Sequence, residues 1–341
     1  MTYSSLIFLK EKKILLGIGA ILVCTLAYAF FAQAKNSDQS TATCSHTHRY
    51  INPELDCINT DTAYAHIRTS EEKTRAYVGE EIDNAHATRI SVFFRDLQTK
   101  RWYGVNENEQ FSPGSLLKLP LAIAYYKLAE VTPEILTQEF IYKQGDSLNT
   151  LEHFDSSTPL VQGKAYSVSD MIERMLKNSD NDVVATLAGY INKEVYQKVF
   201  TDLGVDVPAA QNGGINADFF SAKIYAAMLR TLYNASYLNP EQSEKILTIL
   251  SQSSFADGLV FGLPQRTMIA HKFGERTEID VNTKQVVKRE LHDCGIIYRQ
   301  DNPYILCVMT EGQNFDDLKK IIANISRIVW ENSDQGGGLA L

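Results

Sequence analysis

Near the start of the chain, 21 consecutive residues from Ile14 to Ala34 carry no charge, and Lys10, Lys12 and Lys13 precede them. At about 1.5 Å per residue, a helix of this length spans the roughly 30 Å hydrocarbon core of a bilayer. Lysines in front of such a span stay on the cytoplasmic side. The sequence therefore predicts a membrane anchor or signal segment over residues 1–34, with the rest of the chain exported.

A cleaved signal peptide is the alternative interpretation of this run. Small residues at Ala27 and Ala29, or at Ala32 and Ala34, resemble the cleavage sites of such peptides. An uncleaved run predicts a membrane-anchored protein with an extracytoplasmic domain, either periplasmic or at the cell surface. A cleaved run predicts a secreted one.

The composition fits a folded protein that acts on small or peptide-like molecules. Of its 341 residues, 44% are hydrophobic and 22% are charged, which is typical of globular domains. The net charge of −8 argues against a nucleic-acid partner, because binding phosphates needs a basic surface. The sequence has no metal-ligand set of standard spacing and no phosphate-binding glycine loop, so it predicts no metal and no cofactor.

Changes in composition divide the chain after the apolar run. Residues 35–84 are predicted to be a polar tether and N-terminal extension, residues 85–333 a globular domain, and residues 334–341 a flexible tail. In the exported tether, Cys44 and Cys57 are predicted to form a disulfide. A metal site with His46 and His48 is the alternative, although their spacing matches no standard zinc pattern.

Two further cysteines, Cys294 and Cys307, lie on apolar stretches that flank an Asp-Asn-Pro turn. This pattern predicts a β-hairpin in which the two cysteines face each other. They are either joined in a disulfide or packed as small hydrophobic residues.

A serine and a lysine three residues apart lie in an otherwise apolar segment. Residues 89–105 predict a β-hairpin, after which Ser112-Pro113-Gly114 breaks the chain and a helix begins. Ser115 and Lys118 then share one helical face and can touch. Either Lys118 extends to solvent, or it is desolvated, which lowers its pKa and lets it take the proton of the serine hydroxyl.

A second polar group, Ser179-Asp180-Asn181, follows an amphipathic helix that opens with a Ser167/Asp170 capping box. Such residues favour turns over helix interiors, so they also mark a simple break between two helices. A third element is an apolar strand that leads to Lys272 and, two positions later, Gly274.

The ordered set Ser115-x-x-Lys118, Ser179-Asp180-Asn181 and Lys272-x-Gly274 resembles the active site of the penicillin-recognising serine hydrolases, and most of all the class A β-lactamases. The resemblance covers roughly residues 85–333. It implies an α+β fold, in which an antiparallel sheet from residues 89–105 and 268–310 is flanked by helices, including one over 315–331, with an all-helical subdomain between.

The resemblance also implies roles for these residues. Ser115 would attack the carbonyl of a β-lactam or of a D-Ala-D-Ala-like peptide, with Lys118 as the base. Ser179 would pass a proton to the leaving nitrogen, Lys272 would supply positive potential beside Ser179 and the substrate carboxylate, and Asn181 would hold the substrate's amide. The backbone amides of Ser115 and Glu275, next to Gly274, would form the oxyanion hole. Asp180 is expected to brace the turn.

Two departures from the family pattern affect the expected chemistry. Phe273 stands where a threonine or serine usually binds the substrate carboxylate. Either an arginine takes that role, Arg276 being preferred to Arg266, or recognition of the carboxylate is weak. The interval between Asn181 and the predicted helix that begins at Ser221 is short and lacks the family's Glu-x-x-x-Asn, and its part from Leu203 to Phe220 offers as acids only Asp206 and Asp218.

These departures leave two functions open. An exported serine hydrolase would form the acyl-enzyme and hydrolyse it slowly, with Asp206 as a substitute base or as a residue that caps a turn. A non-catalytic penicillin- or peptidoglycan-binding module of the same fold is the alternative.

Overall fold

The computed structural model describes residues 60–143, 147–154, 158–208, 218–300 and 302–333. The predicted membrane segment, the Cys44/Cys57 pair and the predicted tail lie outside these ranges. In the parts of the chain that are described, no helix combines the length and the apolar character needed to cross a bilayer.

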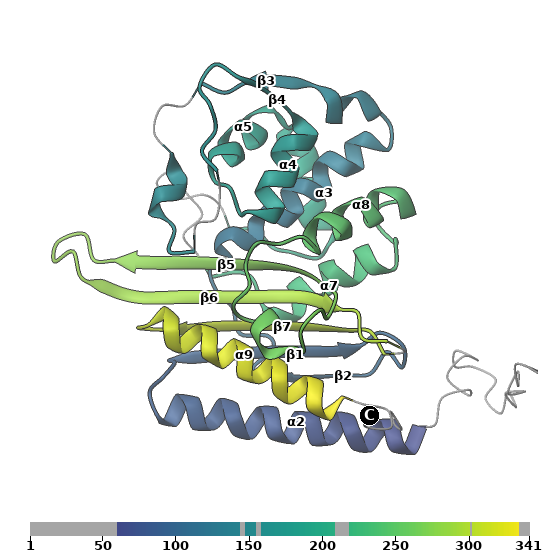
Figure 1. The fold of residues 1–341 in the computed structure, drawn as a ribbon, viewed down its shortest axis with the longest axis vertical. Helices are drawn as coiled ribbons and strands as arrows, with labels where there is room; N and C mark the ends of the chain where they lie inside the picture. Colours follow the sequence, from purple (N-terminus) through teal and green to yellow (C-terminus); the bar gives the residue numbers. More distant parts are fainter. Residues whose placement is uncertain (1–59, 144–146, 155–157, 209–217, 301, 334–341) are drawn as a thin grey trace, which may run out of the picture. The chain divides into compact units, whose positions relative to one another are not determined.

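A five-stranded antiparallel sheet forms the centre of the fold, in the order β2-β1-β7-β6-β5 (Figure 1). Its strands are β1 (Arg89–Asp96), β2 (Trp102–Val105), β5 (Ile269–Ile279), β6 (Val286–Ile297) and β7 (Tyr304–Gly312). Both predicted hairpins are present, and the first and last parts of the domain meet where β1 pairs with β7. The α+β architecture predicted from the sequence is confirmed.

Helices cover both faces of this sheet, so alternate residues of a strand enter different cores. In β1, Phe93 belongs to one hydrophobic cluster, whereas Val92 and Phe94 belong to the other. Side chains in a strand alternate between faces, and burial on both faces explains why these strands read as nearly continuous apolar runs.

One face is covered by α2 (Thr60–Asp83) and α9 (Phe315–Asn332), which pack against each other. The opposite face is covered by α7 (Ala222–Tyr233). In Figure 1, α9 crosses in front of the sheet and α2 runs along its lower edge.

The compact unit therefore begins at Thr60, inside the segment predicted to be a tether and extension over residues 35–84. The buried side of α2 includes polar residues, so the sequence of this helix does not show a clear apolar face. Ser70 and Thr74 are fully buried and contact the Tyr103 hydroxyl at 2.9 and 3.1 Å. Buried hydroxyls that are hydrogen-bonded cost little, so a mostly polar helix packs here.

The remaining helices lie beyond β5, at the top of Figure 1. They are α3 (Lys118–Ala129), α4 (Val168–Lys177), α5 (Asp182–Tyr190), α6 (Lys193–Asp202) and α8 (Pro240–Leu250). Short 3₁₀ turns and a small two-stranded ribbon connect these elements. The turns are η2 (Gly114–Leu117), η3 (Pro133–Thr137), η4 (Leu148–Leu151) and η5 (Val260–Gly262). The ribbon consists of β3 (Glu139–Ile141) and β4 (Ala165–Ser167). Ser167 and Asp170 form the predicted capping box.

Cys294 and Cys307 lie directly opposite each other on β6 and β7, as the predicted hairpin requires. Their sulfur atoms are bonded. Of the two arrangements that the sequence left open, the structure has the disulfide.

Candidate active site

Ser115 lies in the 3₁₀ turn η2, just before α3, and only 6% of it is exposed. Gly114 before it adopts a φ of +48°, a conformation that favours glycine. A Cβ at Gly114 would lie 2.6 Å from the backbone oxygen of Glu275 on β5. The glycine therefore lets the serine turn approach the edge strand of the sheet.

Lys118 begins α3 and is almost completely buried, with its amine turned inward. Its Nζ donates to Ser115 Oγ at 2.7 Å and to Ser179 Oγ at 3.0 Å, and also to the backbone oxygen of Ser179. Burial lowers the pKa of Lys118 to about 8, although Glu152 and Asp180 oppose this effect. Of the two arrangements considered from the sequence, the desolvated lysine beside the serine is present.

Ser179 occupies the break between α4 and α5 with a φ of +57°. Its Oγ accepts hydrogen bonds from two lysines, because Lys272 Nζ lies 3.0 Å away from it. Lys272 on β5 is fully buried, and burial, together with the nearby charge of Lys118, holds its pKa well below the ordinary value. One hydroxyl thus connects the amines of Lys118 and Lys272.

Asp180 braces this turn, as expected from the sequence. Its carboxylate is fully buried, lies 2.7 Å from Arg174 and accepts hydrogen bonds from the Asp182 backbone amide and the Asn149 side chain. A buried carboxylate with these partners holds the backbone that presents Ser179 and Asn181.

The edge strand β5 approaches the serine turn most closely at Gly274. A Cβ there would lie 2.9 Å from the Pro113 backbone oxygen and 3.1 Å from the Leu116 backbone nitrogen. Any side chain at this position would push the strand away, so the glycine of the Lys-x-Gly motif has a packing reason. The next residue, Glu275, lines the cleft together with Ser115.

A cleft of about 280 Å³ opens in front of Ser115. Its lining residues are Gly114, Ser115, Leu117, Lys118, Leu121, Glu152, Asn181, Val184, Ala188, Tyr196 and Glu275. One side is thus apolar, and the other carries the lysine, the amide and two carboxyl groups. Small-molecule sites often combine an apolar wall with a few polar groups in this way.

Glu152 is a cleft residue that sequence reasoning missed. It follows η4 and accepts a hydrogen bond from Asn181 Nδ2 at 2.5 Å. From the sequence, Glu275 was expected only to supply its backbone amide to the oxyanion hole. Its carboxyl oxygens also accept hydrogen bonds from the backbone amides of His153 and Phe154, at 3.0 and 2.8 Å. Burial raises the pKa of Glu275 to about 7, and the neighbouring Glu152 adds to this shift. No motif in the sequence marks either carboxyl.

Phe273 does not face the cleft. Its ring is 2% exposed and stacks on Phe255 with a centroid distance of 4.2 Å, within the core under α9. The substitution that the sequence flagged is therefore a packing feature of the far face of β5.

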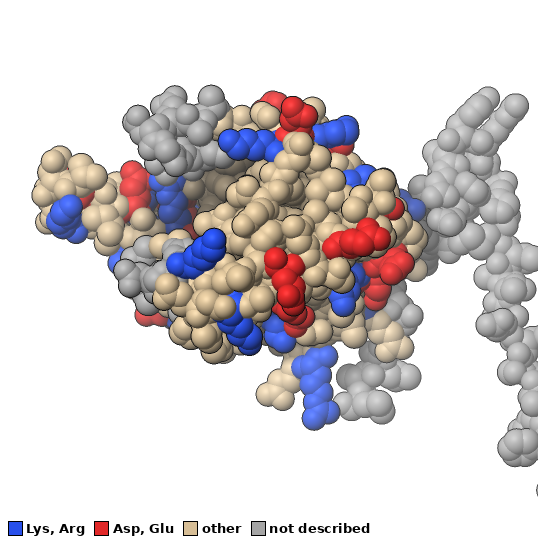
Figure 2. Space-filling view, turned by 90° about the horizontal axis from the view of Figure 1, so that it is seen from above, with Lys and Arg blue, Asp and Glu red and all other residues tan. Residues whose placement is uncertain are grey.

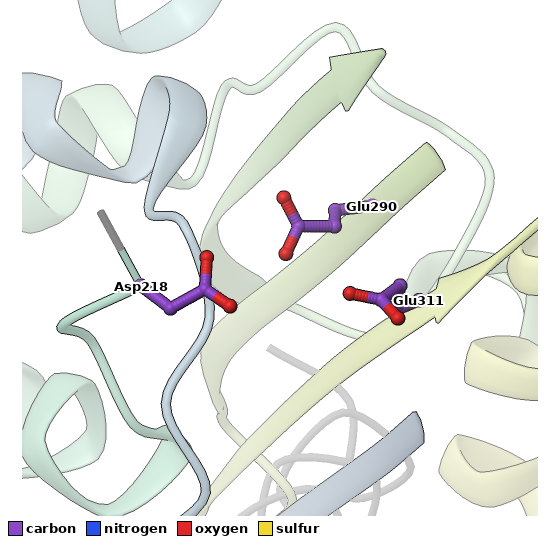
Figure 3. Close-up of side chains that lie close together, drawn as sticks. All are labelled: Asp218, Glu290 and Glu311. Carbon is purple, nitrogen blue, oxygen red and sulfur yellow. The ribbon is translucent and has the colours of Figure 1, made fainter. Parts of the chain in front are cut away.

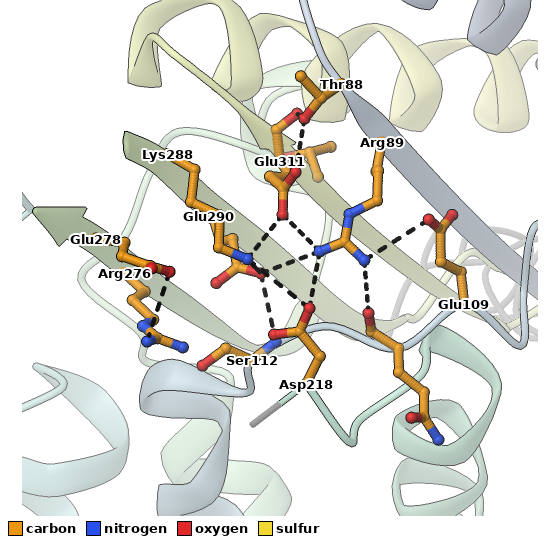
Figure 4. Close-up of polar contacts among 12 residues, drawn as sticks. Thr88, Arg89, Glu109, Ser112, Asp218, Arg276, Glu278, Lys288, Glu290 and Glu311 are labelled. Atoms are coloured by element: carbon orange, nitrogen blue, oxygen red, sulfur yellow. Dashed lines mark hydrogen bonds and ion pairs between the residues drawn. The ribbon is translucent and has the colours of Figure 1, made fainter. Parts of the chain in front are cut away.

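The two arginines proposed to replace the missing hydroxyl do not line the cleft. Arg276 lies 3.9 Å from Glu278 on the same strand, as Figure 4 shows, and Arg266 is exposed before β5 begins. Among the described residues that line the cleft, Lys118 is the one with a basic side chain.

The two acids expected from the sequence as possible bases also lie elsewhere. Asp206 is exposed and is not part of the cleft lining. Asp218 belongs to a separate group of three carboxylates, with Glu290 and Glu311, whose oxygens lie within 4.8 Å of one another (Figure 3).

This acidic group is neutralised by two cations, as Figure 4 shows. Arg89 lies 3.0 Å from Asp218, and Lys288 lies 2.9 Å from Glu311 and 3.4 Å from Glu290. Since both cations already lie among the carboxylates, we interpret the group as an ion-pair network that ties β1, β6 and β7 to the segment before α7.

Figure 2 shows the charged side chains on the face of the molecule that is seen from above. On that face, Figure 2 shows positive and negative side chains interspersed among other residues, without one continuous basic patch.

A sheet-and-helix fold that holds a buried serine, a second serine and two lysines in one hydrogen-bonded group defines a serine hydrolase of β-lactamase-like architecture. A family model described as the beta-lactamase enzyme family matches residues 72–333. This range is well over half of the chain, so the protein belongs to that family. Comparison with curated protein sequences gives no match.

Several solved structures share this fold. A mutant of PBP-A, solved as an acyl-enzyme complex with penicillin G, is 16% identical with a TM-score of 0.61, and the match covers 78% of this chain and 96% of that one. A β-lactamase from Chitinophaga pinensis is 20% identical with a TM-score of 0.64, over 77% of this chain and 100% of that one. A β-lactamase from Xanthomonas campestris is 20% identical with a TM-score of 0.62, over 78% and 99%.

Proposed function

We propose that this protein is an exported serine hydrolase that is acylated at Ser115 by β-lactams or by D-Ala-D-Ala-like peptides. The observation that carries the proposal is the position of the Lys118 amine, within hydrogen-bond distance of the hydroxyls of both Ser115 and Ser179. An amine whose pKa burial lowers to about 8 is unprotonated, and so able to act as a base, in about one molecule in ten at pH 7.

The geometry supports a short proton path. Lys118 takes the proton of Ser115 as its Oγ attacks the substrate carbonyl carbon. Ser179 Oγ, 3.0 Å from Lys118 Nζ, then passes a proton to the departing nitrogen while Lys118 resupplies it. Lys272, 3.0 Å from the same hydroxyl, orients Ser179 by donating a hydrogen bond to its Oγ.

The oxyanion of the intermediate would be held by the backbone amides of Ser115 and Glu275. The close packing of η2 on β5 at Gly114 and Gly274 supports this pairing, because it brings the two backbone segments together. Each such donor typically contributes about 10²–10³ in rate.

We further propose that the acyl-enzyme is hydrolysed more slowly than it forms. The sequence lacks the Glu-x-x-x-Asn of the family loop, and residues 209–217 contain neither aspartate nor glutamate. The apolar run from Ile14 to Ala34 would hold the domain at the outer side of the membrane, or direct its secretion if it is cleaved.

Intact-mass measurement after incubation with penicillin G tests the acylation. We expect a covalent adduct on the wild-type protein, none on Ser115→Ala, and an undiminished adduct on Ser251→Ala, which removes an exposed hydroxyl at the end of α8. A wild-type protein that forms no adduct would refute the proposal and favour the non-catalytic binding module.

A further inference from the structure

Hydrolysis of an acyl group on Ser115 needs a base that can activate water inside the cleft. Among the described residues, the carboxyl groups that line the cleft are those of Glu152 and Glu275. Asp206 is exposed outside it, and Asp218 is held by Arg89. The cleft itself therefore limits the choice to two groups.

The loop that carries Glu152 is fastened to the Ser179–Asn181 turn. Asn149, which is 3% exposed, donates to Asp180 Oδ1 at 2.8 Å and accepts the Asn181 backbone amide at 2.6 Å. Asn181 Nδ2 then donates to Glu152 Oε1. The same turn that binds Lys118 thus fixes one oxygen of Glu152, and the Glu152 carboxyl group also hydrogen-bonds to that of Glu275.

Glu275 holds the other side of this loop, through the backbone amides of His153 and Phe154. Its raised pKa, about 7, means that it carries a proton in a large fraction of molecules at neutral pH. Of the two cleft carboxyl groups, Glu152 acts more strongly on the buried Lys118 amine, whose pKa it raises against the effect of burial. Glu152 is therefore the better placed of the two to accept a proton from water.

We propose that Glu152 is the general base that hydrolyses the acyl-enzyme at Ser115. This inference rests on the proposed function. A water molecule in the cleft gives one proton to the Glu152 carboxylate as its oxygen attacks the ester carbon. The bond between that carbon and Ser115 Oγ breaks, the proton on Glu152 passes to Lys118, which acylation left neutral, and Lys118 gives it to Ser115 Oγ. The products are the free acid and the original serine.

Glu152→Gln is the matched test, because it keeps an oxygen that can accept from Asn181 and removes the basicity. The full-length protein is acylated with penicillin G, excess reagent is removed, and intact mass follows the loss of the adduct over time. We expect the adduct still to form, and its rate of loss to be at least about 10²-fold lower than in the wild type, the usual contribution of a general base. Glu152→Asp should recover part of the loss.

Asp206→Asn is the control, since it makes the same chemical change at an exposed acid outside the cleft. It should release the acyl group at the wild-type rate. The proposal would be overturned if Glu152→Gln released the acyl group as fast as the wild type. It would also be overturned if Glu152→Gln lost acylation and release to the same extent, or if the wild-type adduct were never released. A wild type that forms no adduct counts instead against the proposed function.

Discussion

Gly114→Ala tests whether the serine turn must lie this close to the edge strand. The added Cβ would lie 2.6 Å from the Glu275 backbone oxygen, whereas ordinary contacts begin at 3.4 Å, so the two segments must separate by about 0.8 Å (3.4 − 2.6). The φ of +48° adds a strain of about 1–2 kcal/mol for any residue with a Cβ.

This separation falls between the two backbone amides proposed to hold the oxyanion, those of Ser115 and Glu275. Loss of one such donor costs about 10²–10³ in rate. We expect the acylation rate of Gly114→Ala with a chromogenic cephalosporin, measured by stopped-flow absorbance, to fall about 10²-fold. The Tm should also fall, by about 2–4 °C per kcal/mol of lost stability.

Gly79→Ala is the matched control, because a Cβ at that position in α2 would contact nothing within 4 Å. There the same change should leave acylation unaltered and raise stability by up to about 1 kcal/mol, since alanine favours a helix more than glycine does. The reasoning would be refuted if Gly114→Ala kept the wild-type acylation rate, or if both variants lost activity to the same extent.

Three further predictions follow from burial and covalent structure. Because burial lowers the pKa of Lys118 to about 8, the acylation rate should rise with pH through about 8 and then level off; a rate that is flat across this range would exclude Lys118 as the base. The folded state then binds fewer protons than the unfolded chain between about 8 and the ordinary value of 10.5, so the contribution of Lys118 to the free energy of unfolding should increase over that window. Phe273→Ala should lower the free energy of unfolding by about 3–5 kcal/mol in a denaturant titration, because its ring is stacked on Phe255 in the core, and a loss below about 1 kcal/mol would contradict that packing. Reduction of the Cys294–Cys307 disulfide, which closes a separation of 13 residues, should lower the free energy of unfolding by about 3 kcal/mol. Labelling of Cys294 or Cys307 by a thiol reagent in the untreated, denatured protein, located by peptide mapping, would disprove the bond.

The parts of the site that were predictable from the sequence depend on local spacing. Residues three apart share a helical face, so contact between Ser115 and Lys118 follows from their positions alone. The meeting of Lys118, Ser179 and Lys272 joins three distant segments, and only the family resemblance predicted it. Short-range patterns carry no information on such long-range contacts.

Other features were missed because the deciding contacts are not local. The buried face of α2 includes Ser70 and Thr74, whose partner Tyr103 lies on another element, so the helix read as a polar tether. The orientation of Phe273 away from the site could have been predicted. Neighbouring residues of a strand point to opposite faces of the sheet, and Lys272 points toward the site. The sequence gives no pattern for Glu152, which reaches the cleft from an irregular loop.

The pairing of β1 with β7 has a consequence for how the protein is made. Arg89 pairs with Glu311, more than two hundred positions later in the chain, and the last strand inserts between β1 and β6. During synthesis the first hairpin has no partner until nearly the whole polypeptide has been released by the ribosome, and contacts of such long range slow folding. A product truncated before Tyr304 would therefore expose an unpaired strand edge to aggregation.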